Sequence, residues 1–139
     1  MGQKLEQEFT VLYVEDNPAN LRLIMRLFSS KPEIKLISAL TPSQGIKEAL
    51  KNHPDLFMLD INLPEMDGYD LLEKLREFPQ FNNTPAIAIS ANAMTVDVLK
   101  GQDSGFDDYV TKPIDITLFE SLINQKINKK MQLRNNSLN

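Results

Sequence analysis

The chain contains no cysteine and a single histidine, His53, and these two shortages narrow the chemistry open to it. Without thiols there is no disulfide framework, no thiolate metal site and no cysteine nucleophile. A chain without disulfides fits a reducing compartment. A site for a soft or borderline metal is not expected, because such metals favour sulfur and nitrogen ligands.

Excess positive charge and long apolar runs are also missing. The 139 residues carry a formal net charge of −4, which argues against general nucleic-acid binding. No apolar run approaches the roughly 18 residues of a membrane span, and residues 1–8 lack the apolar region of a secretion signal. Glu6 stands where a myristoylation signal needs Ser or Thr. We therefore expect a cytoplasmic protein that binds neither a membrane nor DNA directly.

Short apolar runs alternate with stretches of helical periodicity along the chain. Strands are predicted over residues 9–14, 34–39, 55–60, 85–90 and 106–110. Each strand is followed by apolar residues at helical spacing, which indicates an amphipathic helix. The helix expected over 94–103 is weak, because it is rich in poor helix formers, and the last helix is expected to begin near Asp115.

This alternation predicts an α/β fold, a single doubly wound five-stranded parallel sheet with five helices. Right-handed crossovers narrow the possible topologies. The flavodoxin-like fold, a known member of this class, has the strand order 2-1-3-4-5, which we expect here. Residues 9–128 are expected to form the one domain. Residues 1–8 are expected to be a polar N-terminal tail, and residues 129–139 a frayed polar C-terminal tail or linker remnant.

The chain is organised around Asp60, which ends the apolar run Leu56–Leu59. A short run without polar alternation suits a strand buried on both faces. Pro64 and the pair Asp67 and Gly68 then predict a turn before the next helix. Asp60 is therefore expected at the carboxyl end of a central strand, the edge of an open α/β sheet where ligands bind.

Two further acids, Glu15 and Asp16, follow the first strand. In the expected order strands 1 and 3 are neighbours, so their carboxyl ends should bring Glu15, Asp16 and Asp60 together. Three carboxylates in one cleft repel one another, which raises pKa values or recruits a cation. Because carboxylate oxygens and water suit a hard ion, the acids predict a Mg²⁺ site.

A hydroxyl and an ammonium fall at the same edge, since Ser90 follows the fourth strand and Lys112 the fifth. A carboxylate, a divalent ion, a hydroxyl and an ammonium are components of phosphoryl transfer. An Asp side chain can attack phosphorus to give an aspartyl-phosphate. The cation, Lys112 and Ser90 would stabilise charge on the transferring oxygens. Each residue alone would suit an ordinary structural role, and their convergence favours this chemistry.

Four segments at these strand ends resemble the receiver (response regulator) domain of two-component signalling. They are residues Val14–Asn17, Leu59–Gly68, Ser90–Ala93 and Gly105–Pro113. The resemblance covers residues 9–128, and it looks closest to receivers of hybrid sensor kinases and of phosphorelays.

The resemblance implies roles for the acids and for the loop after Asp60. Asp60 looks like the phosphoacceptor. Glu15 and Asp16 look like the acidic pair that holds Mg²⁺ together with Asp60, and the backbone carbonyl of Asn62 looks like a further ligand. Mn²⁺ is a possible substitute for Mg²⁺.

Further roles follow from the same resemblance. The residues expected to bind the phosphoryl group or to switch with it are Ser90, Ala91, Lys112 and Tyr109. Two neutral amides, Asn62 and Asn92, occupy positions that tune phosphoryl lifetime in the family. The peptide bond before Pro113 is expected to be cis, which costs little for an X–Pro bond.

The resemblance implies a phosphorylation-controlled switch rather than an enzyme, apart from self-catalysed phosphorylation and dephosphorylation. The chain would be a stand-alone or phosphorelay receiver, or the receiver module of a hybrid sensor histidine kinase. Its donor would be a histidine kinase or a histidine phosphotransfer protein. An output partner would bind the face formed by the fourth helix, the fifth strand and the last helix.

Three alternatives stay open. A Mg²⁺-dependent phosphatase of the haloacid-dehalogenase type also uses a strand-end Asp, but it needs a second acid where this chain has Asn62. A flavodoxin-like cofactor binder needs a first loop that accepts phosphate, and Glu15 and Asp16 would repel it. A receiver used as a non-phosphorylated scaffold would not need the complete set of site residues.

Overall fold

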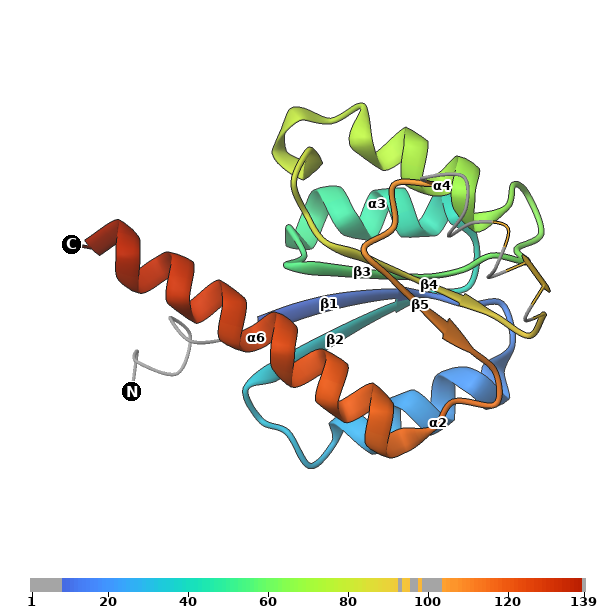
Figure 1. Cartoon of the computed structure of the whole chain (residues 1–139). Helices are drawn as coiled ribbons and strands as arrows, with labels where there is room; N and C mark the ends of the chain where they lie inside the picture. The colour runs from blue at the N-terminus through green and yellow to red at the C-terminus, as the bar shows by residue number, and fades with distance from the viewer. Residues whose placement is uncertain (1–8, 93, 96–97, 99–103, 139) are drawn as a thin grey trace.

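The structure, a computed structural model, describes residues 9–92, 94–95, 98 and 104–138 (Figure 1). Its elements in chain order are β1 (Phe9–Val14), α2 (Pro18–Phe28), β2 (Ile34–Ala39), α3 (Pro42–Asn52), β3 (Leu56–Asp60), α4 (Gly68–Arg76), the 3₁₀ turn η1 (Pro79–Phe81), β4 (Ala86–Ser90), β5 (Asp108–Thr111) and α6 (Ile116–Leu138). Among the described helices, none is long and apolar enough to cross a membrane.

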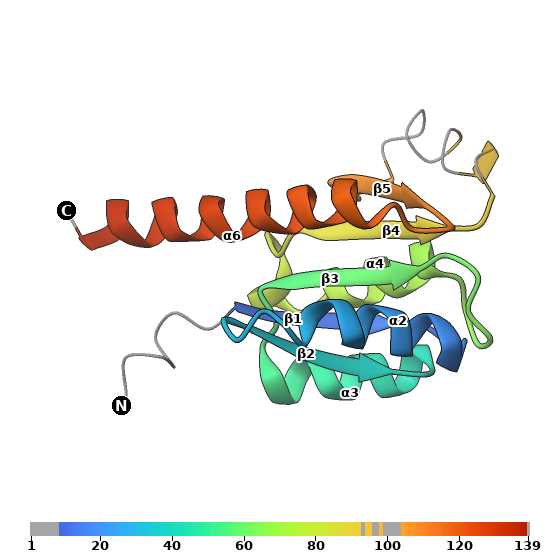
Figure 2. The ribbon, with the colours of Figure 1, turned by 90° about the horizontal axis from the view of Figure 1, so that it is seen from below.

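The five strands form one sheet in the order β2-β1-β3-β4-β5, and every neighbouring pair is parallel. Figure 1 shows the sheet between two helical layers, with α3 and α4 above it and α2 and α6 below it. In Figure 2, seen from below, the five strands lie side by side. The predicted doubly wound, flavodoxin-like architecture is therefore confirmed. The helix expected over 94–103 lies mostly outside the described residues.

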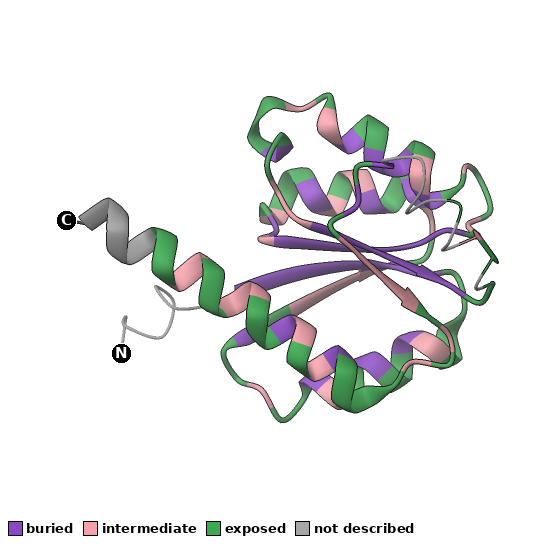
Figure 3. Ribbon diagram, in the orientation of Figure 1, coloured by how far each residue is buried: buried purple, intermediate pink, exposed green. Residues whose placement is uncertain are grey.

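The three central strands are buried along their whole length, as the apolar runs predict (Figure 3). Because successive side chains of a strand point to opposite faces, β1 contributes to both halves of the core. Leu12 and Val14 pack with residues of α3 and α4. Val11 and Tyr13 pack with residues of α2 and α6. This alternation decides which helical layer each side chain at the end of β1 meets.

Three helices begin close to the carboxyl end of a strand because a side chain caps each first turn. The side chain of Asn17 accepts hydrogen bonds from backbone N–H groups in the first turn of α2. In the same way, Thr41 accepts from a backbone N–H in the first turn of α3, and Asp67 accepts from one in the first turn of α4. Such side chains stabilise a helix start by satisfying N–H groups that have no partner within the helix. The caps therefore place three helix N-termini at the edge where Asp60 ends its strand.

Gly68 lets α4 begin directly against the backbone of Asp60. A Cβ atom at position 68 would overlap the carbonyl oxygen of Asp60 and lie 3.0 Å from Cα of Ile61. The Gly68 N–H donates to the carbonyl oxygen of Ile61 at 2.9 Å. The predicted turn before α4 thus packs directly against the backbone of Asp60 and Ile61.

The C-terminal helix is longer than expected, because it continues through residues 129–138, for which we expected a frayed tail or a linker remnant. Helix α6 continues to Leu138 and projects beyond the sheet in Figure 1. Lys130 anchors the extension, because its Nζ lies 2.6 Å from Oδ1 of Asp55 and 5.6 Å from the centroid of the Phe9 ring. Where the domain ends stays a prediction, and the expected tail 1–8 lies outside the described residues.

The fifth strand also begins later than expected, at Asp108 instead of residue 106. The preceding residue, Asp107, already contacts β4, because its N–H donates to the carbonyl oxygen of Ala86 at 2.8 Å. Its carboxylate accepts from the Ala86 N–H at 2.8 Å. At the start of the β4–β5 pair, the Asp107 side chain thus takes the place of a backbone carbonyl as the acceptor for the Ala86 N–H.

Candidate functional site

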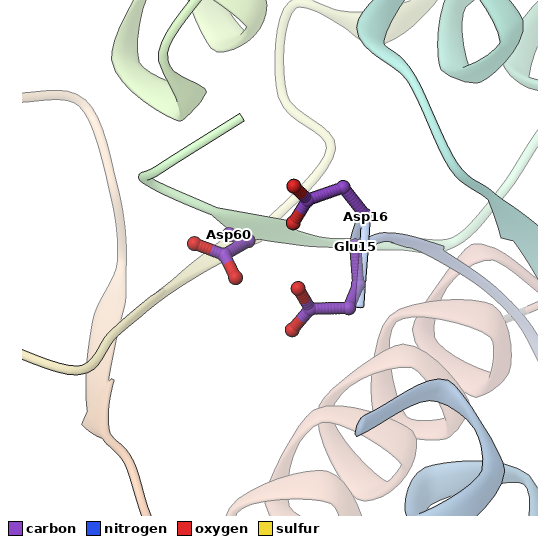
Figure 4. Close-up of side chains that lie close together, drawn as sticks. All are labelled: Glu15, Asp16 and Asp60. Atoms are coloured by element: carbon purple, nitrogen blue, oxygen red, sulfur yellow. The ribbon is translucent and has the colours of Figure 1, made fainter. Parts of the chain in front are cut away.

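Three carboxylates converge at the carboxyl end of the sheet. Glu15 and Asp16 follow β1, and Asp60 ends the neighbouring strand β3. One carboxylate oxygen from each of the three lies within 4.8 Å of the others, and Figure 4 shows these groups facing a common space. Glu15 and Asp60 are buried, with 0% and 2% exposure, whereas Asp16 is exposed. The structure thus brings together the acids that the strand order predicts to be neighbours.

Lys112 bridges two of these acids. Its Nζ lies 2.5 Å from Oδ2 of Asp60 and 2.9 Å from Oε1 of Glu15. The backbone of Lys112 is held in place directly after β5, because the Lys112 N–H donates to the carbonyl oxygen of Ser90 at 2.8 Å. The Lys112–Pro113 peptide bond is cis. One ammonium among three carboxylates leaves an excess of negative charge in this group of side chains.

Burial and close packing separate the proton affinities of the two buried acids. Burial, with the carboxylate of Glu15 close by, raises the pKa of Asp60 to about 6, although Lys112 and the Asn62 N–H oppose the rise. Burial also opposes ionisation of Glu15, but hydrogen bonds from its neighbours hold its pKa below the usual value. For Lys112, burial disfavours the charged form, and its hydrogen bonds to the two acids still raise its pKa. Without a further cation, Asp60 is therefore the acid that takes up a proton first.

Glu15 accepts hydrogen bonds from two side chains that sequence reasoning missed. The Tyr13 hydroxyl donates to Oε1 at 2.9 Å, and Asn20 Nδ2 donates to the same oxygen at 3.2 Å. The Asn17 N–H donates to Oε2 at 3.3 Å. A signal for Tyr13 was present, because residues two apart in a strand share a face. Asn20 lies in the first helical turn after the acids, which is a weaker signal.

The loop between β3 and α4 is attached to both Asp60 and α3. The Asn62 N–H donates to Oδ1 of Asp60 at 2.8 Å, and the Asn62 side chain is exposed. Further along, Oε1 of Glu65 accepts from the Ser43 N–H at 2.9 Å and from the Ser43 hydroxyl at 2.7 Å. The loop that carries the Asn62 carbonyl is thus held at two points.

Ser90 ends β4 at the same edge of the sheet. In the strand register Asp60 pairs with Ile89, so Ser90 lies one residue beyond the partner of Asp60. Its side chain is buried, and its Oγ accepts from the Asn92 N–H at 3.1 Å. Ala91 and Asn92 follow in an exposed loop. The hydroxyl is therefore near the acids but engaged with its own loop in this structure.

Tyr109 lies in β5 with a half-buried ring. Its hydroxyl is 2.8 Å from Oγ of the buried Ser104, and its ring meets that of Phe106 edge-on at a centroid distance of 6.1 Å. Ser104 is a third residue that sequence reasoning missed, and the loop before β5 carries it to the Tyr109 hydroxyl. The phenol is thus held by the loop that precedes its own strand.

The donor chemistry of the site fits a magnesium ion. Carboxylate oxygens are hard ligands, which Mg²⁺ prefers over nitrogen and sulfur. The chain has no cysteine, and His53, its single histidine, ends α3 as the C-cap residue. Glu15, Asp16 and Asp60 are therefore suitable residues to hold such an ion.

Comparison with known proteins gives a consistent set of relatives. The profile of the response regulator receiver domain family matches residues 11–124. The signal transduction histidine-protein kinase BarA of Escherichia coli K12 is 35% identical over 115 residues, which are 82% of this chain and 12% of BarA. The polar-differentiation response regulator DivK of Brucella ovis is 31% identical over 110 residues, which are 79% of this chain and 89% of DivK.

A solved structure agrees with both the sequence relatives and the fold. The receiver domain of a sensor histidine kinase from Pseudomonas aeruginosa PAO1 superposes with a TM-score of 0.77 and 26% identity, and the match covers 87% of this chain and 98% of that one. That crystal structure has a magnesium ion coordinated in its active-site cleft. These matches support a receiver and not a haloacid-dehalogenase phosphatase. With the family profile matching most of its length, this chain belongs to the response regulator receiver domain family of two-component signalling.

Proposed function

We propose that this receiver is a phosphorylation-controlled switch in which Asp60 accepts a phosphoryl group from a phosphohistidine. The observation that carries the proposal is the contact of Lys112 with the buried carboxylates of Asp60 and Glu15 at the carboxyl end of the sheet. An ammonium beside the attacking carboxylate can stabilise negative charge on the transferring group. The regulatory role differs from that of an enzyme, because the phosphoryl group stays on the protein.

The transfer is a displacement at phosphorus. A carboxylate oxygen of Asp60 forms the new O–P bond while the N–P bond of the donor breaks, and the bonding electrons leave with the imidazole nitrogen. Lys112 is 2.5 Å from the Asp60 carboxylate and is suited to bind a phosphoryl oxygen after transfer. Self-catalysed dephosphorylation would follow when water attacks the same phosphorus.

Mg²⁺ is the cofactor that the donor set favours. Glu15, Asp16, Asp60 and the backbone carbonyl of Asn62 would hold it, and Mn²⁺ is a possible substitute. When bound, the ion would neutralise charge on the phosphoryl oxygens. The magnesium ion in the Pseudomonas receiver supports this assignment.

The switch would be read by residues on β4, the neighbour of the Asp60 strand, and on β5, the strand beyond it. Ser90 would leave its contact with Asn92 and donate to the phosphoryl group, with the small Ala91 leaving room beside it. Tyr109 would then leave Ser104, so that β5 and its neighbouring helices change their surface. Such a change is a shift between two populations biased by the added charge. Asn62 and Asn92 would tune the lifetime of the phosphoryl group.

The partners follow from this role. The donor is a histidine kinase or a histidine phosphotransfer protein, and the relatives BarA and DivK support membership of such a pathway. An output partner would bind β5 and α6, together with the expected fourth helix, most of which lies outside the described residues. We also propose that the chain acts in the cytoplasm, binds no DNA directly, and works either alone or as the receiver module of a hybrid kinase.

Intact-mass measurement after incubation with acetyl phosphate and Mg²⁺ tests the proposal. The wild type should gain one phosphoryl group, and Asp60→Asn should gain none. Asp55→Asn is a matched control, because Asp55 lies just before the amino end of β3 and Asp60 lies at its carboxyl end. The control should gain the group as the wild type does, and chelation of Mg²⁺ should abolish the gain in both.

Two outcomes would contradict the proposal. A gain of mass in Asp60→Asn would place the phosphoryl group elsewhere. No gain in the wild type, together with no effect of beryllofluoride on its melting temperature, would leave a scaffold receiver without a working site. If beryllofluoride does stabilise the wild type, the site is intact and requires a protein donor, which a purified histidine kinase with ATP then supplies.

A further inference from the structure

Tyr13 places a buried hydroxyl next to the candidate cation site. It is among the largest fully buried side chains, and its position on β1 puts it on the same face as Glu15. The hydroxyl donates to Oε1 of Glu15 at 2.9 Å. Packing alone does not need a hydroxyl there, and a buried hydroxyl without a partner would be costly. The Tyr13–Glu15 hydrogen bond therefore needs an explanation beyond filling the core.

The two oxygens of Glu15 have unequal surroundings. Oε1 receives three donors, which are the Tyr13 hydroxyl, Asn20 Nδ2 and Lys112 Nζ. Among the described contacts, Oε2 accepts one hydrogen bond, from the Asn17 N–H at 3.3 Å. Oε2 therefore keeps more of the acceptor capacity that a cation, or a water bound to it, requires.

A glutamate at this position needs more support than an aspartate would. Glu has one more rotatable bond than Asp, so its carboxylate has more orientations to lose when it binds a cation. Groups that hold a ligand by hydrogen bonds orient it and commonly contribute to metal affinity. Tyr13 reaches Glu15 from within the strand, so the packed ring fixes where the hydroxyl lies.

We propose that Tyr13 is a positioning residue for the Mg²⁺ site, whose hydroxyl holds Oε1 of Glu15 toward Lys112 and leaves Oε2 for the cation. This inference rests on the proposed function, because it assumes that the acids bind Mg²⁺. It adds a residue from the apolar strand to a site otherwise built from strand ends and loops. The hydroxyl acts through Glu15, its hydrogen-bond partner among the described contacts.

A double-mutant cycle with calorimetric measurement of Mg²⁺ binding tests this role. Tyr13→Phe keeps the ring and removes the hydroxyl, and it should weaken Mg²⁺ binding about tenfold, the lower end of the effect expected for a residue that orients a metal ligand. In Glu15→Asp the carboxylate ends one methylene short of the phenol. Adding Tyr13→Phe to Glu15→Asp should therefore change Mg²⁺ affinity less than about twofold.

A second readout separates positioning from general damage. At saturating Mg²⁺ the rate of phosphorylation of Tyr13→Phe by acetyl phosphate should match the wild type, while the Mg²⁺ concentration at half-maximal rate should rise. Thr10→Val is the control, because it removes a hydroxyl from the amino end of the same strand. Its Mg²⁺ affinity should equal that of the wild type.

Three outcomes would overturn the inference. Wild-type Mg²⁺ affinity in Tyr13→Phe, even with a lowered melting temperature, would reduce the hydroxyl to a packing role. The same loss of affinity in the Glu15→Asp background would show that the effect does not pass through Glu15. An absence of Mg²⁺ binding in the wild type would refute the cation site of the proposed function itself, and the role of Tyr13 with it.

Discussion

The two ends of this sheet use acidic side chains in opposite ways. At the amino end, Asp55 accepts from the Thr10 N–H at 2.8 Å, and Asp107 accepts from the Ala86 N–H at 2.8 Å. Each acid thus satisfies a backbone donor at the start of a neighbouring strand. At the carboxyl end, Asp60 bonds to the N–H of its own loop and shares its lysine with another acid.

The balance of charge differs between these ends as well. At the amino end Lys130 pairs with Asp55 and Lys126 pairs with Asp108, so each of these acids has its own lysine. At the carboxyl end Glu15, Asp16 and Asp60 are close to a single ammonium, that of Lys112. The contrast teaches that a carboxylate with its own donors is structural, whereas a group of carboxylates that outnumber their donors is suited to recruit an ion.

The largest expected effect on stability comes from disrupting the close contact between Gly68 and the backbone of Asp60 at the carboxyl end of the sheet. Gly68→Ala should lower the free energy of unfolding by about 3 kcal/mol, because the added Cβ overlaps the carbonyl oxygen of Asp60 and forces the loop to shift. Phosphoryl uptake should fall in the fraction that remains folded. Urea denaturation and intact mass measure the two effects. A wild-type denaturation midpoint would show that the loop moves without cost.

Removing one lysine from each end sharpens the comparison. Without Mg²⁺, Lys112→Ala should lower the free energy of unfolding by roughly 2–3 kcal/mol, since it leaves two buried acids without their ammonium. Lys130→Ala should cost less than about 1 kcal/mol, because its pair is partly exposed and Asp55 keeps the Thr10 N–H. Urea denaturation of both variants checks this order. Equal losses would contradict the distinction between the two ends.

The pH dependence of stability should report on Asp60. Its pKa is raised from 3.8 to about 6 in the folded, metal-free protein, so between these values the folded state binds more protons than the unfolded state. Stability should therefore fall as pH rises through this window, by about 3 kcal/mol for the whole shift. The lowered pKa of Glu15 acts in the opposite direction, but below its usual value of 4.5. The range from pH 4.5 to 6 thus isolates Asp60.

Urea midpoints measured in a chelating buffer across this range check the prediction. Asp60→Asn should remove the slope, because an amide does not titrate there. Asp55→Asn, at the amino end, should keep it. A slope that persists in Asp60→Asn would assign the titration to another group.

The smallest expected effect is stabilisation of the wild type by the ion. Mg²⁺ at ten times its dissociation constant should raise the free energy of unfolding by about 1.4 kcal/mol, because the ion binds the assembled acids and not the unfolded chain. Asp16→Asn should reduce this gain, while Lys130→Ala should keep it. Thermal melts with and without Mg²⁺ provide the measurement. An equal gain in Asp16→Asn would exclude Asp16 as a ligand.

The local patterns of the sequence were sufficient to predict the layout of the sheet and the acid cluster. Continuous apolar runs mark β1, β3 and β4, and the caps Asn17 and Thr41 mark the helix starts that follow two strands. These signals depend on neighbours in the chain. Once the strand order was predicted, the carboxyl ends of β1 and β3 had to be adjacent, which placed Glu15, Asp16 and Asp60 together.

Contacts between distant residues were decided by the tertiary structure alone. The extension of α6 depends on Lys130 reaching Asp55 and Phe9, and a polar tail gives no local sign of such an anchor. Tyr13 and Glu15 are only two residues apart, so the sequence indicates that they share a face, but only the structure shows the hydrogen bond between them.

The sequence by itself therefore determined which acids meet, because local periodicity predicts alternating strands and helices, and the flavodoxin-like fold of that class places strands 1 and 3 side by side. Only the tertiary structure decided how they share their donors, with Lys112 between Asp60 and Glu15. It also decided that Asp60, and not Glu15, has the raised pKa. The physical reason is that burial and hydrogen-bond geometry act over a few ångströms in space, whatever the separation of the residues along the chain.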